Sequence, residues 1–287
     1  MKKILLTGLT GNIGSGIVEK LDELFESGTS IEILEYIKPI KIREYSSLKI
    51  KIVRELENNY DIAIHLAANS DINFCKNPDN WGEVLKQNVE LTKKICEKSD
   101  KVIFISTDYV FDGKLNKWES WTEDEEKKPV NEYGKSKSLA EDIVISHKGI
   151  VLRVETMMGI KNKIIDAAKR AIEGKDLHYH PFWTNNFIRP SYFPDFYRVL
   201  KNSIQKNVFG IYHVSCSGEA LSRNEMAQIV LDIYKEKGWR RKLDYLESEE
   251  APLTKRFVLN TDKTKRELRI EFTDSREAIR KHVLDGC

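Results

Sequence analysis

The stretch "LLTGLTGNIGSGI" at residues 5–17 joins a short apolar run to the start of an amphipathic segment. Its glycines Gly8, Gly11 and Gly14 are spaced G-x-x-G-x-x-G, a spacing that permits a tight turn and a close approach of the backbone to a ligand. A helix that begins here also directs free N–H groups toward a bound pyrophosphate. Because this is the first strand-to-helix unit of the chain, the pattern predicts a dinucleotide-binding turn rather than a plain connection.

Apolar runs alternate with helix-length amphipathic segments through the first half of the chain. The expected strands are residues 2–7, 31–36, 40–45, 62–68, 101–107 and 149–155, and the expected helices are residues 12–27, 47–58, 80–98 and 133–147. This alternation is typical of a parallel sheet with helices on both faces. The predicted fold class is therefore α/β, a Rossmann-type doubly wound parallel sheet.

The regular alternation ends after Glu155. Beyond it we expect helices at 162–174 and 194–206, a strand at 210–215, and a helix with Ser222 as N-cap and Glu225 as its capping-box partner.

The break in the pattern predicts two domains of unequal size. We expect residues 1–155 to form the NAD(P)-binding domain, with residues 186–215 returning to it. Residues 156–185 and 216–287 are expected to form a smaller C-terminal α/β lobe that binds the substrate.

The composition argues against a nucleic-acid or membrane partner. Lys plus Arg (47) nearly balance Asp plus Glu (45), and the charges are interspersed along the chain. No apolar run approaches the length of a membrane span, and the first residues do not form a signal peptide. The four cysteines show no metal-ligand spacing and no disulfide pattern, so we expect a cytoplasmic protein without a metal site.

The segment "NEYGKSK" places Tyr133 and Lys137 four residues apart, on one face of the helix expected at 133–147. The strand at 101–107 ends in Ser106 and Thr107, at the edge of the sheet where ligands of such folds bind. The sequence therefore predicts a catalytic set of Thr107, Tyr133 and Lys137.

These three groups suit the reduction of a carbonyl, which needs a hydride on carbon and a proton on oxygen. The Tyr133 phenol can supply the proton if its pKa falls toward the working pH. Burial raises this pKa, so the Lys137 ammonium and an oxidised nicotinamide must together outweigh burial. The Thr107 hydroxyl can hold the substrate oxygen beside Tyr133.

The choice between NAD and NADP depends on the group that meets the adenosine ribose. Glu35, at the end of the second expected strand, would accept hydrogen bonds from the ribose hydroxyls and repel a 2′-phosphate, which favours NAD. Lys38 and Lys41 follow closely and could pair with that phosphate instead.

The motifs "TGLTGNIG" (7–14), "HLAAN" (65–69), "STDYVFDG" (106–113) and "YGKSK" (133–137), in this order, resemble the extended short-chain dehydrogenase/reductases. Within them, "STDYVFDG", "NEYGKSKSLAE" and "GIYHVSCSGEALSRNEMAQ" are similar to the dTDP-4-dehydrorhamnose reductases. The resemblance implies a reductase of a nucleotide-linked keto sugar in deoxysugar or polysaccharide biosynthesis. It also implies a Rossmann domain that binds NAD or NADP, and it allows for a homodimer.

The resemblance also implies roles for individual residues. It assigns cofactor binding to Gly8, Gly11, Asn12, Ile13, Leu66, Ala67 and Ala68, and it gives Asn88 a supporting place at the active site. The residues predicted for the cofactor further include Thr10, Glu35, Asn88, Tyr133 and Lys137. The resemblance assigns substrate binding to Asn69, Asp108, Asn186 and Phe187.

The chain departs from the reductase pattern at three places. "SDINFCKNPDNW" (70–81) replaces an acidic Val-Asp-x-Ala-Glu stretch, and "VETMMGI" (154–160) replaces a Thr-Ser-Trp stretch. The loop at 183–191 lacks the usual Asp-Gln start and Pro-Thr ending. A different nucleotide-linked sugar is therefore open as the substrate.

Two other functions stay open. A nucleotide-sugar epimerase with tightly bound NAD would use the same residues. A non-catalytic regulatory subunit resembling that of methionine adenosyltransferase would keep the fold without turnover. A dehydratase is disfavoured because Asp108-Tyr109 stands where that class has Asp-Glu after the threonine.

Histidines and aromatic residues elsewhere suggest no further catalytic group. His65 lies in an apolar strand and is expected to pack in the core. The cluster at 178–183 is interpreted as an aromatic lid or a sugar-stacking surface rather than a metal site, since it lacks acidic or cysteine partners.

Overall fold

The computed structural model describes residues 2–35, 45–116, 119–173, 182–238, 248–249 and 255–285. Three predictions fall outside the described residues. They are the expected strand at 40–45, apart from Tyr45, the lysines Lys38 and Lys41, and residues 178–181 of the aromatic cluster. The chain divides into two compact units. Unit 1 comprises Met1–Asp112, Glu123–Arg153 and Tyr197–His213, and unit 2 comprises Gly113–Thr122, Val154–Phe196 and Val214–Cys287.

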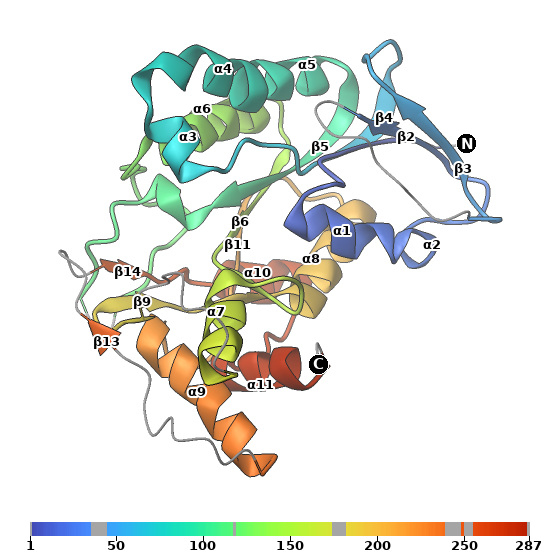
Figure 1. Cartoon of the computed structure of the whole chain (residues 1–287). Coiled ribbons are helices and arrows are strands. Elements are labelled where there is room, and N and C mark those ends of the chain that lie inside the picture. Colours follow the sequence, from blue (N-terminus) through green and yellow to red (C-terminus); the bar gives the residue numbers. More distant parts are fainter. Residues whose placement is uncertain are drawn as a thin grey trace. The chain divides into compact units, whose positions relative to one another are not determined.

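A seven-stranded sheet with the order β11-β6-β5-β4-β1-β2-β3 forms the centre of unit 1 (Figure 1). Its strands are β1 (Lys3–Thr7), β2 (Ser30–Leu34), β3 (Lys49–Val53), β4 (Tyr60–His65), β5 (Ser99–Thr107), β6 (Ile150–Val154) and β11 (Gly210–Val214). Neighbouring strands from β3 to β5 pair in parallel. The order reverses between β1 and β4, which confirms the predicted doubly wound α/β fold.

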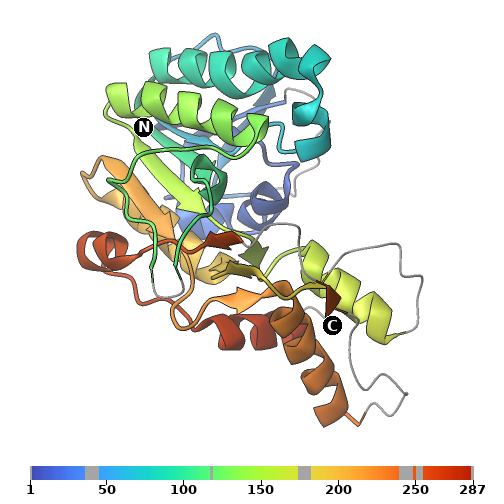
Figure 2. The same ribbon diagram turned by 90° about the vertical axis from the view of Figure 1, so that its left-hand side faces the viewer.

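Helices cover both faces of this sheet. They are α1 (Asn12–Val18), α2 (Leu21–Leu24), α3 (Ile72–Lys76), α4 (Trp81–Leu85), α5 (Leu91–Glu97), α6 (Glu132–Ser146) and α8 (Phe193–Gln205), which belongs to unit 1 from Tyr197 onward. Figures 1 and 2 show α5 and α6 side by side on one face, and Figure 1 shows α1 and α8 on the other. The helix expected at 80–98 is interrupted by η2 (Lys86–Glu90), a π-helical turn.

The helix predicted at 47–58 is wrong, because this segment contains β3. Lys49, Ile50, Lys51 and Ile52 alternate in polarity with the two-residue period of a strand, and β3 pairs in parallel with β2 at the edge of the sheet. Such an edge strand is covered less than the central ones, and Ile52 is accordingly 41% exposed.

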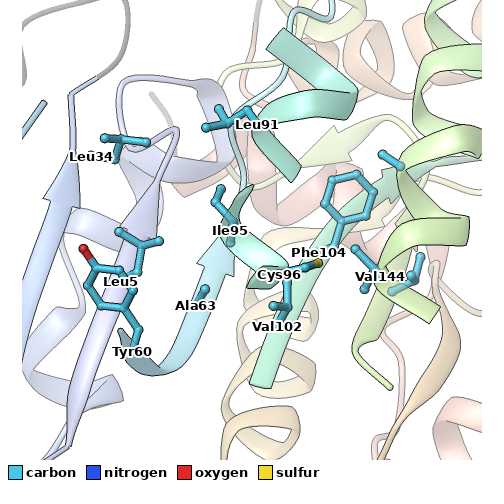
Figure 3. Packing of buried hydrophobic residues seen from close by; sticks show 12 residues of the cluster. Leu5, Leu34, Tyr60, Ala63, Leu91, Ile95, Cys96, Val102, Phe104 and Val144 are labelled. Atoms are coloured by element: carbon cyan, nitrogen blue, oxygen red, sulfur yellow. The ribbon is translucent and has the colours of Figure 1, made fainter. Parts of the chain in front are cut away.

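One hydrophobic core cluster of unit 1 lies on the face of the sheet that α5 and α6 cover (Figure 3). Phe104 of β5 and Ala63 of β4 pack there with Ile95 of α5 and Val144 of α6, and all four are fully buried. Because both helices dock on this apolar layer, the residues at the carboxyl end of β5 and at the start of α6 are held on a rigid base.

Unit 2 is a smaller α/β assembly. Its strands are β7 (Met157–Met158), β8 (Phe182–Trp183), β9 (Asn186–Ile188), β10 (Ser191–Tyr192), β12 (Leu221–Ser222), β13 (Ser248–Glu249) and β14 (Lys255–Phe257). Its helices are α7 (Lys163–Ile172), α9 (Arg223–Glu236), α10 (Asp262–Leu268) and α11 (Ser275–Asp285). The predicted capping box at the start of α9 is confirmed, because Ser222 and Glu225 each accept the other's backbone N–H.

Within the described parts of the chain, no helix is both long and apolar enough to cross a bilayer.

Candidate active site

The glycine turn after β1 needs glycine at two positions for steric reasons. Gly8 has φ +73°, and a Cβ atom there would lie 2.4 Å from the Ala67 backbone nitrogen. A Cβ atom on Gly14 would lie 2.3 Å from the Gly8 carbonyl oxygen. The turn is closed by Gly11 N–H, which donates to the Gly8 carbonyl at 3.0 Å. The glycines therefore leave open backbone next to the ends of β1 and β4, as a bound dinucleotide requires.

A cleft of about 380 Å³ opens beside this turn, at the carboxyl ends of β1, β2 and β4. Its lining includes seven of the residues predicted for the cofactor, namely Gly8, Thr10, Gly11, Glu35, Leu66, Ala67 and Ala68. The predicted residues Asn12 and Ile13 lie in the first turn of α1, and Asn88, Tyr133 and Lys137 are likewise outside this lining. The cleft stands at the point where the strand order reverses, where nucleotides bind in such sheets.

The lining also contains residues that the sequence did not single out. These are Leu9, Leu34, Ser70, Asp71, Gln87 and Leu91, and Asn69, predicted for the substrate, lines the cleft as well. Their positions beside predicted residues were the only available signal, because they carry no motif of their own.

Glu35 lines the cleft just beyond the end of β2. Its backbone N–H donates to the Val53 carbonyl at 2.8 Å, and its carboxylate lies 3.5 Å from Nε of Arg54. The Arg54 side chain is 84% exposed whereas that of Glu35 is 17% exposed. The position thus offers a largely covered carboxylate at the cleft, paired with an exposed guanidinium.

Thr107 lies at the end of β5 and brings the predicted acid into a defined set of hydrogen bonds. Its Oγ1 accepts from the Tyr109 N–H at 3.2 Å and donates to Oδ1 of Asp108 at 2.9 Å. The Tyr133 hydroxyl is also hydrogen-bonded to Thr107. This hydrogen bond favours the ionised phenol, so it opposes the effect of burial on the pKa of Tyr133.

Local packing fixes Tyr133 at the start of α6. Asn131 caps the helix, with its Oδ1 accepting from the Gly134 N–H at 2.8 Å. A Cβ atom on Gly134 would lie 2.2 Å from the Tyr109 carbonyl oxygen, so only glycine lets the helix start come this close to the chain after β5. The glycine in "YGKSK" therefore lets the start of α6, which carries Tyr133, pack closely against the chain that follows Thr107.

Burial controls the protonation of the three titratable groups here. The pKa of Tyr133 is raised, first by burial and then by Asp108, so the phenol keeps its proton. Burial lowers the pKa of Lys137 to about 7, although the Glu141 carboxylate opposes this shift. Burial raises the pKa of Asp108 to about 7 against the hydrogen bond from Thr107. The lowered tyrosine pKa that the reaction would require is thus absent in the protein alone, because burial and Asp108 outweigh the hydrogen bond with Thr107.

Lys137 is 2% exposed, and its Nζ lies 3.7 Å from the centroid of the Phe104 ring. This aromatic face stabilises the ammonium and fixes its place under α6. The structure therefore brings together Thr107, Tyr133 and Asp108 by hydrogen bonds, and holds Lys137 one helical turn away.

Asn88 lies behind the cleft wall, in the π-helical turn η2. Its Oδ1 accepts from the Asn69 N–H at 2.7 Å, and its Nδ2 donates to the Asn69 carbonyl at 3.0 Å and to Oγ of Ser136 at 2.9 Å. Asn88 thus joins the cleft residue Asn69 to α6. π-Helical turns of this kind are often found at functional sites.

Unit 2 holds the other predicted substrate residues, Asn186 and Phe187, on β9. Arg256 of β14 is in register with Phe187, and its guanidinium carbon lies 5.8 Å from the Phe187 ring. Arg223 lies over the Trp183 ring at 4.5 Å. The sequence did not single out either arginine, since each meets its aromatic partner only through the fold.

The match to a protein family covers the whole chain. Residues 1–286 match the model of the family described as "RmlD substrate binding domain". The chain belongs to this family. This membership confirms the predicted resemblance to the extended short-chain dehydrogenase/reductases, which are a group of NAD(P)-dependent oxidoreductases.

Individual relatives are distant and differ in function. The chain is 24% identical over 242 residues to "Probable low-salt glycan biosynthesis reductase Agl14" of Haloferax volcanii, covering 79% of each protein. It is 31% identical over 145 residues to "Methionine adenosyltransferase 2 subunit beta" of Danio rerio, which is 46% of this chain and 43% of that one.

A solved dTDP-4-dehydrorhamnose reductase of Bacillus anthracis, in complex with NADP, matches 100% of both chains with a TM-score of 0.77 and 17% identity. At this identity the match establishes the shared fold.

Proposed function

We propose that the chain is an NAD(P)H-dependent reductase of a nucleotide-linked keto sugar, of the dTDP-4-dehydrorhamnose reductase type. The observation that carries the proposal is the hydrogen bond between Tyr133 and Thr107 at the end of β5, with buried Lys137 one turn further along α6. This set is linked through Asn88 and Asn69 to the glycine-lined cleft.

In this proposal Tyr133 delivers the proton. Its raised pKa keeps the phenol protonated in the protein alone, so the proton is available, and transfer requires this pKa to fall toward the working pH once cofactor and substrate are bound. When bound, NAD(P)H supplies the hydride to the carbonyl carbon, and the proton from Tyr133 completes the alcohol. Thr107 holds the carbonyl oxygen, and the Lys137 cation stabilises the phenolate left on Tyr133.

We further propose that the cofactor is NAD(H) rather than NADP(H). The open backbone of Gly8 and Gly11 fits a pyrophosphate, and the Glu35 carboxylate in the same cleft fits the ribose hydroxyls. Titration with NADH and NADPH tests the choice. NADH is expected to bind more tightly, and Glu35→Gln is expected to reduce the difference between the Kd values for NADPH and NADH. Tighter binding of NADPH by the unmodified protein would reverse the assignment.

For the substrate we propose contacts to Asn69 and Asp108 in unit 1 and to Asn186 and Phe187 in unit 2. Arg256 beside Phe187 supports this role for unit 2, because a guanidinium is suited to the diphosphate of a nucleotide-sugar. A homodimer and a cytoplasmic location remain predictions from the sequence.

The test follows the absorbance of NADH and NADPH in separate assays with a panel of nucleotide-linked 4-keto sugars. Tyr133→Phe is expected to lower turnover by about 10²- to 10⁴-fold, as loss of a general acid does, with cofactor affinity retained. The matched control is Tyr109→Phe. The Tyr109 ring packs edge-on to the Tyr133 ring with 6.4 Å between the centroids, and this substitution likewise removes one phenolic hydroxyl. Normal turnover by Tyr133→Phe would show that another group is the acid.

A second candidate is a non-catalytic subunit, favoured by the 31% identity to the Danio rerio subunit. It predicts inactivity on the whole sugar panel together with a partner protein that co-purifies reproducibly. An epimerase would instead keep its cofactor through gel filtration and convert a sugar without net oxidation of the cofactor.

A further inference from the structure

We infer that His65 is a positioning residue, which couples the cofactor cleft to the catalytic helix α6 through a chain of hydrogen bonds with one fixed direction. The inference rests on the proposed reductase function, because it concerns how the site of that reaction is held. The sequence alone placed His65 in the core with no functional role.

The histidine lies at the end of β4 and is completely buried. Its Nδ1 is 2.7 Å from Oγ1 of Thr7 on β1, and its Nε2 is 3.0 Å from Oγ1 of Thr92 on α5. Both threonines are also completely buried. Both ring nitrogens are therefore engaged by hydroxyl groups that water does not reach.

The direction of each hydrogen bond follows from the ends of the chain. The Thr92 hydroxyl lies 2.7 Å from the Asn88 carbonyl, which can only accept, so Thr92 donates there. Thr92 has no second proton, and Nε2 of His65 must therefore be the donor to it. The ring thus carries a proton on Nε2.

The other side of the ring gives a consistent direction. Burial and the nearby Lys137 lower the pKa of His65 to about 3, so the ring is neutral and Nδ1 is an acceptor. Thr7 then donates to Nδ1, and its oxygen accepts the Ala67 N–H at 3.2 Å. Each of the four hydrogen bonds from the Ala67 N–H to the Asn88 carbonyl therefore has a single direction, with its donor and acceptor fixed.

The two ends of this chain are parts of the candidate site. Ala67 lines the cofactor cleft beside the glycine turn. At the other end Asn88 donates to Ser136, and the Ser136 hydroxyl donates to the Tyr133 carbonyl at 2.8 Å. His65 therefore fixes the cleft wall on one side and, through Asn88, the start of α6 on the other.

The ring geometry permits separate tests of the two sides. Asparagine places its amide near the position of Nδ1, and glutamine places its amide near the position of Nε2. His65→Asn should keep the bond to Thr7 and lose the bond to Thr92, whereas His65→Gln should do the reverse. Ile64→Val is the matched control, because it loosens the adjacent buried position of β4 without touching a polar group.

We expect a split between cofactor binding and turnover. His65→Gln should weaken NADH binding about tenfold with kcat little changed, because a lost buried hydrogen bond has an effect of that order. His65→Asn should lower kcat about tenfold with NADH affinity little changed. Variants that match Ile64→Val in both quantities would show that His65 is only a packed core residue.

A second measurement uses the unmodified protein, so it depends neither on the folding of a variant nor on a sugar substrate. Nitrogen-15 NMR of the imidazole rings of the unmodified protein should show a neutral ring with its proton on Nε2 from pH 8 down to pH 5. A proton on Nδ1, or a charged ring in this range, would overturn the inference. This NMR result is independent of turnover. It therefore distinguishes failure of the hydrogen-bond chain through His65 from failure of the proposed reductase function.

Discussion

Asp108 is a buried carboxyl group beside the proposed acid, and its surroundings make it a sensitive reporter on this part of the site. It is 8% exposed, accepts the Thr107 hydroxyl and contributes to the raised pKa of Tyr133. A charged carboxylate here would oppose formation of a phenolate on Tyr133. The proposed reaction therefore depends on how far Asp108 stays protonated.

Asp108→Asn should change how stability depends on pH. The folded pKa of about 7 lies above the ordinary value of 3.8, so this group contributes stability below about pH 4 that is lost as the pH rises through 7. Asparagine does not titrate and can still accept from Thr107. The variant should therefore gain stability relative to the unmodified protein between pH 4 and pH 7.5.

The gain is expected to be on the order of 4 kcal/mol, since a tenfold change in proton affinity corresponds to about 1.4 kcal/mol. Urea unfolding of both proteins at several pH values measures it, and the contributions of other groups cancel in the difference. A difference that stays constant with pH would show that Asp108 ionises normally.

At the scale of elements, the turn between β1 and α1 depends on backbone that only glycine provides. Gly8→Ala adds a Cβ atom 2.4 Å from the Ala67 nitrogen at a φ of +73°. Gly28 supplies the control, because its φ is +82° and no atom lies within 4 Å of an added Cβ. Both alanine variants should lose about 1–2 kcal/mol to the left-handed backbone.

Only Gly8→Ala should also lose NADH binding, since the cleft wall at Ala67 must move. Urea unfolding and NADH fluorescence titration separate the two effects. Equal cofactor affinity in the two variants would mean that the cleft is not the cofactor site.

A buried ion pair fastens α6 to the sheet. The guanidinium of Arg153 on β6 donates to both oxygens of Glu141 at 3.0 and 2.8 Å, and the two side chains are 1% and 0% exposed. Lys127 lies 3.6 Å from the same carboxylate. Glu141 follows Lys137 by one turn, so this pair holds α6 in place next to the proposed site.

Glu141→Leu should destabilise the protein by about 3–5 kcal/mol, because it leaves the Arg153 charge buried without its partner. Arg153→Met should cost less, since Lys127 still faces Glu141, and the double variant should be less destabilised than the sum of the two. Arg280→Met, which breaks an exposed pair with Glu236, is the control and should show no measurable change. Additive effects of the two buried substitutions would show that they do not act as a pair.

The elements of unit 1 could mostly be predicted because their apolar residues repeat with the period of the structure they form. The strand at 49–53 was missed although Lys49 and Lys51 alternate with Ile50 and Ile52, because a run of five residues is too short for its period to decide, and only pairing with β2 does so. The π-helical turn at Lys86–Glu90 interrupts the helix but contains no proline or glycine, so the sequence gives no sign of the interruption. The hydrogen bonds of His65 could not be predicted, since its partners Thr7 and Thr92 lie 58 and 27 positions away in sequence.

For the whole molecule, the fold alone does not determine the reaction, because the same architecture serves several activities. The glycine turn, Thr107, Tyr133 and Lys137 all belong to unit 1, while Asn186 and Phe187 belong to unit 2. The residues proposed for cofactor binding and for proton delivery thus all lie within one compact unit. This division predicts different responses of the two units to the cofactor.

NADH should therefore protect unit 1 from hydrogen exchange and leave helix α9 of unit 2 unaffected. At a concentration of 100 times Kd, binding stabilises the folded cleft by about 2.7 kcal/mol, which corresponds to roughly hundredfold slower opening of the structure around it. The amides of Gly11, Ala67 and Asn69 should slow most, because they lie in the turn and the cleft wall. Gly8→Ala, which should not bind NADH, serves as the control for indirect effects. Protection of α9 alone would place the cofactor in unit 2 and contradict the assignment of the cleft.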